Sequence, residues 1–245
     1  LLSGGRFHLG VAVGCRDEEF DAYGIDKSDR VGRTVEGIRL IRKLFTERSV
    51  TYEGDIFQVE DLDLMPRPAQ ESIPIWYGGQ SEYAIKRSAR MADAWSMSPI
   101  ETRSELAESA EMYREILEEQ DRSYETVRKP LRREAYIAED DETAWEEVGP
   151  SLLYEYQDVY GDYDDIGHTF DSDGDTEAAI EELREHAADR FVIGGPETAI
   201  EEFERYEEEI GVDDMILRMH FPGLDPEKSG KSMRLVAEEV MPHFQ

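Results

Sequence analysis

The chain has 245 residues and carries 58 acidic against 27 basic side chains, which gives a net charge of −31. A field of that sign repels nucleic acid and anionic membranes, so we expect neither as a partner. No window approaches the ~18 apolar residues of a membrane-spanning helix. The single cysteine, Cys15, excludes a disulfide framework and a thiolate metal cluster within the chain, so we expect a reducing cytoplasmic location and no metal.

The acidic residues are spread over every predicted helix, and few of the basic residues are lysines. The apolar pattern is regular, which argues against disorder. An acidic surface poor in lysine is what a salt-loving cytoplasm favours. We therefore predict a halophilic archaeal source and a fold that molar KCl stabilises.

The first predicted element is a strand over 6–13. Large apolar residues at positions 7, 9, 11 and 13 alternate with small or polar residues at positions 8, 10, 12 and 14. One face of this strand is bulky, and the other is nearly bare and leaves room for something to lie against it. We interpret His8, near the start of the strand, as structural.

Strands and helices then alternate along the chain. A polar, turn-rich stretch over 18–29 precedes a helix over about 30–47 and a β-hairpin over 50–59. Gly149-Pro150 predicts a kink or break, and 161–174 predicts a loop or lid. The remaining expected strands are 75–78, 94–97, 133–138, 191–194 and 215–220, and the remaining helices are 83–91, 101–120, 142–160, 177–188, 195–210 and 226–240.

This alternation indicates an α/β fold with parallel strands in a single domain, 1–245. A doubly wound sheet and a (β/α)8 barrel both fit the order. The barrel typically needs ~250 residues and eight strands. We count five clear strands and a weaker sixth over 191–194, so the chain has fewer strands than a barrel needs.

The stretch Gly78-Gly79-Gln80-Ser81 lies between a short apolar strand and a predicted helix. Glycines let the backbone approach a ligand closely, and the N-terminus of a helix favours a phosphate. We predict that this turn holds the phosphate of a flavin-type cofactor. The alternative is an ordinary strand-to-helix turn without a ligand.

Several blocks in order resemble the luciferase-like monooxygenase family. They begin with residues 5–14 and 19–24 and continue with Tyr52-Glu53-Gly54-Asp55-Ile56-Phe57 and Pro66-Arg67-Pro68. The most recognisable block runs from Ile73 through Ser81 to Trp95. The last blocks are Ile193-Gly194-Gly195-Pro196-Glu197-Thr198 and Glu238-Glu239-Val240-Met241-Pro242, so the resemblance covers nearly the whole chain.

The resemblance implies a (β/α)8 TIM barrel of the bacterial-luciferase type, with a flavin or deazaflavin at the C-terminal ends of its strands. Family members usually run about a hundred residues longer, and the strand over 6–13 looks like the family's fourth. We therefore expect that the first three βα units are absent from this chain. The resemblance also places Gly14 and Cys15 against the flavin, beside Gly78, Gly79, Gln80 and Ser81 as the cofactor-phosphate loop.

Other candidate residues have a plainer alternative. His220, at the end of the last predicted strand, is the best acid–base candidate, although a structural histidine is the alternative. Cys15 is predicted as an inert, partly buried thiol, and Arg30 and Arg33 as surface salt-bridging residues. The spacing of Asp171, Asp173 and Asp175 imitates a calcium loop by chance, and Trp76, Trp95 and Trp145 are expected in the core.

The function that we expect is a two-component monooxygenase that uses reduced FMN and O2 on a small organic substrate. The alternative is a deazaflavin (coenzyme F420)-dependent hydride-transfer oxidoreductase. A non-catalytic flavin-binding protein and a phosphate-binding barrel isomerase or lyase are alternatives of other classes. The expected partners are the substrate, a separate flavin reductase and further copies of the chain in a homo-oligomer.

Overall fold

The computed structural model describes residues 2–160 and 175–244, and it has the α/β fold that the sequence predicts. The chain divides into two compact units, each of which is described by itself. The first unit comprises 1–96 and 116–127, and the second comprises 97–115 and 128–245. The expectation of a single domain stays a prediction, and the proposed lid over 161–174 lies outside the described residues.

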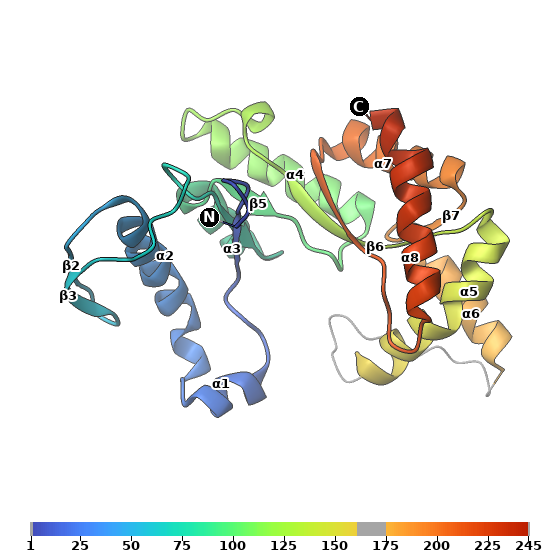
Figure 1. Cartoon of the computed structure of the whole chain (residues 1–245), viewed down its shortest axis with the longest axis horizontal. Helices are drawn as coiled ribbons and strands as arrows, with labels where there is room; N and C mark the ends of the chain where they lie inside the picture. The colour runs from blue at the N-terminus through green and yellow to red at the C-terminus, as the bar shows by residue number, and fades with distance from the viewer. Residues whose placement is uncertain (1, 161–174, 245) are drawn as a thin grey trace. The chain divides into compact units, whose positions relative to one another are not determined.

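The first unit contains a parallel three-stranded sheet in the order β1-β4-β5. Its strands are β1 (Leu9–Val11), β4 (Ile75–Gly78) and β5 (Ala94–Ser96), and α3 (Glu82–Met91) follows β4. Figure 1 labels β5 of this sheet and the helix α3. Ile75 and Tyr77 are fully buried, and they form a core cluster with Ile38, Ala84 and Ala92. The large residues of β1 pack partly against this cluster, as the alternation of the sequence predicts.

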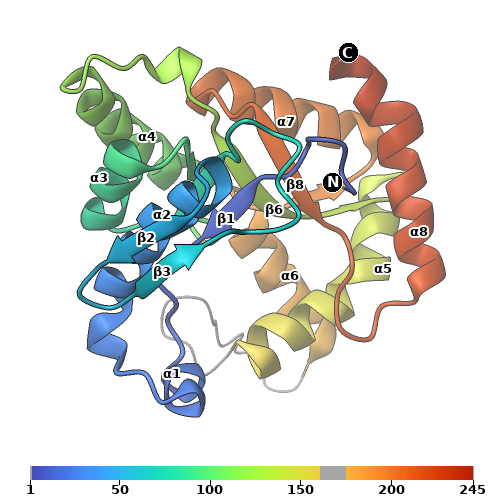
Figure 2. The same ribbon diagram turned by 60° about the vertical axis from the view of Figure 1, so that its left-hand side comes forward.

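A long helix and a hairpin make up another part of the first unit. The helix α2 spans Arg30–Thr46, and the hairpin pairs β2 (Val50–Glu53) with β3 (Gln58–Leu62) in antiparallel fashion (Figure 2). The buried carboxylate of Glu36 in α2 accepts hydrogen bonds from the backbone N–H groups of Ile56, at 3.0 Å, and Phe57, at 2.6 Å. This carboxylate fixes the hairpin turn to the helix.

The expectation of an irregular stretch over 18–29 is wrong. A short helix α1 (Asp17–Tyr23) and a 3₁₀ turn η1 (Lys27–Asp29) occupy most of it. Three acidic residues occupy the first turn of α1, and Gly24 ends it in the left-handed conformation, which stabilises both ends of a helix. No residue of α1 is buried, so it has no apolar stripe from which the sequence could predict it.

The second unit contains a parallel sheet in the order β7-β6-β8. Its elements are β6 (Pro130–Ile137), α5 (Asp141–Tyr154), α6 (Thr176–Ala187), β7 (Val192–Gly194), α7 (Pro196–Ile210), β8 (Asp214–Arg218) and α8 (Pro226–Leu235). Figure 1 labels β6 and β7 and the helices α5 to α8. The core joins residues of β6, α5, α6 and β7, with Trp145, Val148 and Leu152 at its centre. The weaker strand expected over 191–194 is confirmed as β7.

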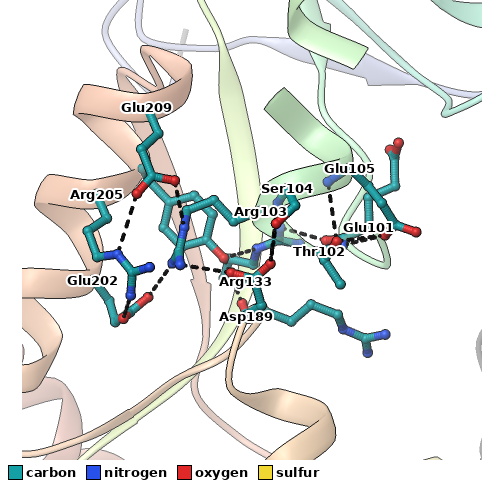
Figure 3. A network of polar contacts seen from close by, with 12 residues as sticks. Glu101, Thr102, Arg103, Ser104, Glu105, Arg133, Asp189, Glu202, Arg205 and Glu209 are labelled. Atoms are coloured by element: carbon teal, nitrogen blue, oxygen red, sulfur yellow. Dashed lines mark hydrogen bonds and ion pairs between the residues drawn. The ribbon is translucent and has the colours of Figure 1, made fainter. Parts of the chain in front are cut away.

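A buried arginine network ties the second unit together. Arg103, at the start of α4 (Arg103–Glu118), forms ion pairs of 2.7, 2.7 and 2.9 Å with Asp189, Glu202 and Glu209 (Figure 3). Arg133 in β6 is fully buried and donates to the Tyr206 hydroxyl at 2.9 Å and to the Pro99 and Glu101 carbonyls. Burial raises the pKa of the Tyr206 phenol, which keeps it a neutral partner for both arginines.

Three details of the second unit differ from the sequence predictions. The strand β6 begins at Pro130 and not at 133, and the last strand ends at Arg218. The helix α5 continues through Gly149 and Pro150, so of the expected kink or break the break is wrong. Core packing of Val148 and Leu152 on either side of the proline holds the helix together, and the π-turn η3 (Glu155–Val159) follows it.

The short elements that remain are η2 (Tyr124–Thr126) in the first unit and η4 (Val236–Val240) and η5 (Met241–Phe244) in the second. In residues 2–160 and 175–244, no helix combines the length and the apolar character that crossing a membrane needs.

Candidate functional site

The glycine turn leaves the C-terminal end of β4 and leads directly into α3. β4 pairs in parallel with β1 on one side and β5 on the other, with Val11 opposite Tyr77 and Gly78 opposite Ser96. The residues that follow β1 and β4 therefore leave the same edge of the sheet. In parallel α/β folds this edge carries the ligand sites.

Position 79 in the turn requires glycine. Its φ of +152° is a conformation that side chains rarely adopt. A Cβ atom at Gly79 would lie 2.5 Å from the Cβ of Ala84, in the first turns of α3. The backbone thus passes directly against the helix start, which requires glycine for a steric reason.

The N-terminus of α3 is open to solvent and well capped. The Ser81 hydroxyl accepts a hydrogen bond from the Ala84 N–H at 3.3 Å, and Gln80, Ser81 and Tyr83 are exposed. The first N–H groups of an α-helix have no acceptor within the helix, so they are available to an anion. Glu82 also lies in this first turn, where it forms an ion pair with Lys86.

Trp95 holds the glycine turn in place through a hydrogen bond. Its indole Nε1–H donates to the Gly79 carbonyl at 2.9 Å, and the ring is fully buried in β5. The sequence predicts Trp95 only as a core residue, which is confirmed, but the pattern holds no signal for this hydrogen bond. Its position in β5, opposite Tyr77 of β4, makes the contact possible.

The bare face of the first strand is exposed, as the sequence predicts. Gly10, Ala12 and Gly14 all face solvent, and a Cβ atom at Gly10 would meet nothing within 4 Å. Ala12 lies beside the turn, since its Cβ is 3.8 Å from the place of a Gly78 Cβ. The same exposed region includes the stacked rings of His8 and Trp76, whose centroids are 4.4 Å apart. Trp76 is therefore only partly buried, and its expected place in the core is wrong.

Gly14 and Cys15 follow the end of β1, beside the glycine turn in the sheet order. Gly14 has a φ of +80°, and a Cβ there would lie 3.0 Å from the Phe20 ring, so α1 packs closely against this turn. Cys15 is exposed, and the expectation of a partly buried thiol is wrong. The physical reason is that the chain leaves the sheet after Val11, and no helix or strand covers Cys15 in the described part of the first unit.

The other candidates lie apart from this turn in the chain. His220 belongs to the second unit, two residues beyond the end of β8, and its Nδ1 lies 2.9 Å from the Ser229 hydroxyl. Its side chain is exposed, and its acid–base role stays a prediction. Arg30 donates to the Lys27 carbonyl and Arg33 lies over the Phe57 ring, and neither forms an ion pair with a residue that the structure describes, so the expected salt bridges are not found there. Asp171 and Asp173 lie outside the described residues.

Curated relatives include both flavin and deazaflavin enzymes. An FMNH2-dependent dimethylsulfone monooxygenase from Pseudomonas putida is 32% identical over 96 residues, which is 38% of this chain and 26% of that protein. An F420-dependent glucose-6-phosphate dehydrogenase from Amycolatopsis mediterranei is 26% identical over 258 residues, which is 100% of this chain and 72% of that protein. The first relatives found, mycobacterial proteins of unknown function, are matched over only 32% of their length.

Among solved structures, a monooxygenase from Streptomyces bottropensis has a TM-score of 0.81 and 19% identity, with 100% of this chain and 70% of that chain covered. At that identity the likeness shows a common fold. The complete barrel and the three absent βα units stay predictions. The family profile described as luciferase-like monooxygenase matches residues 1–214. The chain therefore belongs to the luciferase-like monooxygenase family.

Proposed function

We propose that the protein is an oxidoreductase that binds a flavin or a deazaflavin. The observation that carries the proposal is the Gly79 turn, which brings the backbone against the open, capped N-terminus of α3 at the C-terminal edge of a parallel sheet. This arrangement suits a phosphate group. Both cofactor classes carry one, and relatives that use each class are similar to this chain.

Each part of the site has a role in this proposal. The backbone N–H groups of residues 80–83, with the Gln80 and Ser81 side chains, would hold the cofactor phosphate. The exposed small residues Gly10, Ala12 and Gly14 would leave room for the flat ring system beside β1. Trp95 would keep the turn in the conformation that binds the phosphate, because its indole N–H donates a hydrogen bond to the Gly79 carbonyl.

The bound cofactor would supply the redox chemistry, and the protein would orient it and exclude water. We favour the reaction of a monooxygenase that uses reduced FMN and O2 on a small organic substrate. Hydride transfer with coenzyme F420 is the second candidate, and its support is the F420-dependent relative that aligns with the whole chain. His220 is the proposed acid–base residue on the second unit.

The same proposal includes a separate flavin reductase as a partner, a homo-oligomeric state and a salt-rich cytoplasm. The fold that belongs to this proposal is a single-domain (β/α)8 barrel. None of these statements is needed for the cofactor assignment, which rests on the residues of the first unit.

A cofactor titration tests the proposal. Purified protein is mixed with FMN or with coenzyme F420, and free cofactor is removed. Flavins absorb near ~450 nm and the deazaflavin near ~420 nm, so retained absorbance identifies the class. Retention of either one supports the proposal and selects between the two reactions. If the protein retains neither cofactor at micromolar concentration, the proposal is contradicted.

A further inference from the structure

A cationic groove lies on the first unit. A groove with a volume of about 650 Å³ runs between α2 and α3. Five of its nine lining residues are cationic, and no described carboxylate lines it. The lining residues are Val35, Ile38, Arg39, Arg42, Tyr83, Lys86, Arg87, Arg90 and Met91. In a chain with a net charge of −31, such a concentration of cations needs an explanation.

Helical spacing produces the groove. Residues three or four apart on a helix lie on one face, so Arg39 and Arg42 project from α2 and Lys86 and Arg90 from α3 into one space. The floor is apolar, because Ile38 is buried and packs in the core cluster of the first unit. The groove therefore combines an apolar base with a cationic rim.

Three of the five cations are not neutralised by a carboxylate. Arg42 pairs with Asp93 at 2.8 Å, and Lys86 pairs with Glu82. Arg87 donates instead to the neutral Tyr77 hydroxyl at 2.9 Å. Within the part of the chain that the structure describes, Arg39 and Arg90 form no ion pair and no side-chain hydrogen bond, and both are exposed. The groove thus has three positive charges to offer to a ligand.

From this arrangement we infer that the groove binds a small, multiply charged organic anion, and that a phosphorylated molecule is its best match. Guanidinium groups bind phosphate through two parallel hydrogen bonds, which favours phosphate where arginines predominate. The volume lies within the range of small-molecule sites, ~300–1,000 Å³. The apolar floor and the exposed Tyr83 ring would contact the organic part of the ligand.

The groove shares Tyr83 with the proposed phosphate-binding residues 80–83, but its unpaired cations lie away from the glycine turn in the chain. The turn lies at the N-terminal end of α3, whereas Arg87 and Arg90 lie in its last turns. Arg39 and Arg90 have no described contact with Gly78 to Ser81, so they can be changed without altering the turn. The inference therefore does not depend on the cofactor assignment.

Calorimetric titration with adenosine diphosphate and with inorganic pyrophosphate tests the inference. The variant is Arg39→Gln with Arg90→Gln. The matched control, Arg6→Gln with Arg48→Gln, removes the same charge from exposed arginines of the same unit outside the groove. All proteins are measured at one KCl concentration at which circular dichroism shows them folded. The Ser81→Asp variant, whose added charge lies at the glycine turn, is titrated with the same two anions, so that binding at the turn is distinguished from binding in the groove.

We expect saturable binding at one site, tighter for the diphosphate with its organic part than for pyrophosphate. The groove variant should bind at least about tenfold more weakly, since it loses two cations that can form charge-assisted hydrogen bonds to the anion, while the control stays within about twofold. Three outcomes would overturn the inference: no saturable binding of either anion, equal weakening in both variants, or an unchanged affinity in the groove variant.

Discussion

At the scale of single residues, Gly79 determines the shape of the candidate site. Its φ and its closeness to Ala84 mean that any side chain must shift the start of α3. We expect Gly79→Ala to lower the free energy of unfolding by about 3 kcal/mol, from backbone strain and overpacking together. Chemical denaturation measures this loss, and cofactor titration should show that binding is lost with it.

The control for this substitution is Gly37→Ala in α2. A Cβ at Gly37 would make an ordinary contact of 3.7 Å with the Phe57 ring, and the residue lies inside a helix. Alanine is better than glycine there by up to ~1 kcal/mol. A Gly79→Ala protein as stable as the Gly37→Ala protein would show that the turn tolerates a side chain.

The limits of prediction from sequence are also visible at single residues. The glycines of the turn could be found because a strand, a glycine pair and a helix follow one another in the chain. The hydrogen bond from Trp95 to Gly79 could not, because it joins residues of different strands and depends on their register. The burial of Glu36 could not be predicted from the sequence either, since a helical glutamate usually faces solvent.

At the scale of elements, the Arg133 network holds β6 to α7 and to the segment before α4. We expect Arg133→Leu to destabilise the second unit by about 3 kcal/mol or more, because it leaves the Tyr206 hydroxyl and three carbonyls, those of Ser98, Pro99 and Glu101, without this donor. Thermal unfolding followed by circular dichroism measures the effect.

Arg205→Leu is the matched control in the same network. Arg205 is about half exposed and pairs with Glu202 and Glu209 on its own helix, an arrangement worth ~0–1 kcal/mol. The melting temperature should therefore change little. Equal losses in the two variants would show that the burial of Arg133 is not what makes its contacts important.

The elements that sequence analysis placed well are those with a strong apolar period. α2 and the hairpin follow their predicted bounds closely. So does α7, because its buried residues recur on one face, at Ala199, Phe203, Tyr206 and Ile210. α1 was missed because end-capping and an acidic first turn form it without burial. The continuation of α5 through Pro150 depends on tertiary packing that the local sequence does not contain.

At the scale of the whole molecule, the net charge of −31 sets how the fold responds to salt. Repulsion among exposed carboxylates is screened as the Debye length falls from ~10 Å at 0.1 M to ~3 Å at 1 M salt. We expect the melting temperature to rise by at least about 10 °C between 0.1 and 2 M KCl, as screening and salting-out act together. A melting temperature that does not change with KCl would contradict the prediction of a halophilic protein.

The central claim is that the glycine turn binds the cofactor through its phosphate, and a single comparison tests it. Affinities are measured for FMN against riboflavin, and for coenzyme F420 against its chromophore without the phosphodiester. Two variants accompany the wild type. Both Ser81→Asp and Ser81→Asn keep a good helix cap, but only the first places a negative charge at the proposed phosphate position.

We predict that the wild type and Ser81→Asn bind the phosphate-bearing form of one pair at least about tenfold more tightly than the form without phosphate. Ser81→Asp should lose that preference, because its carboxylate repels the phosphate and competes for the same N–H groups. Equal affinity of the wild type for both members of each pair, or an undiminished preference in Ser81→Asp, would contradict the account.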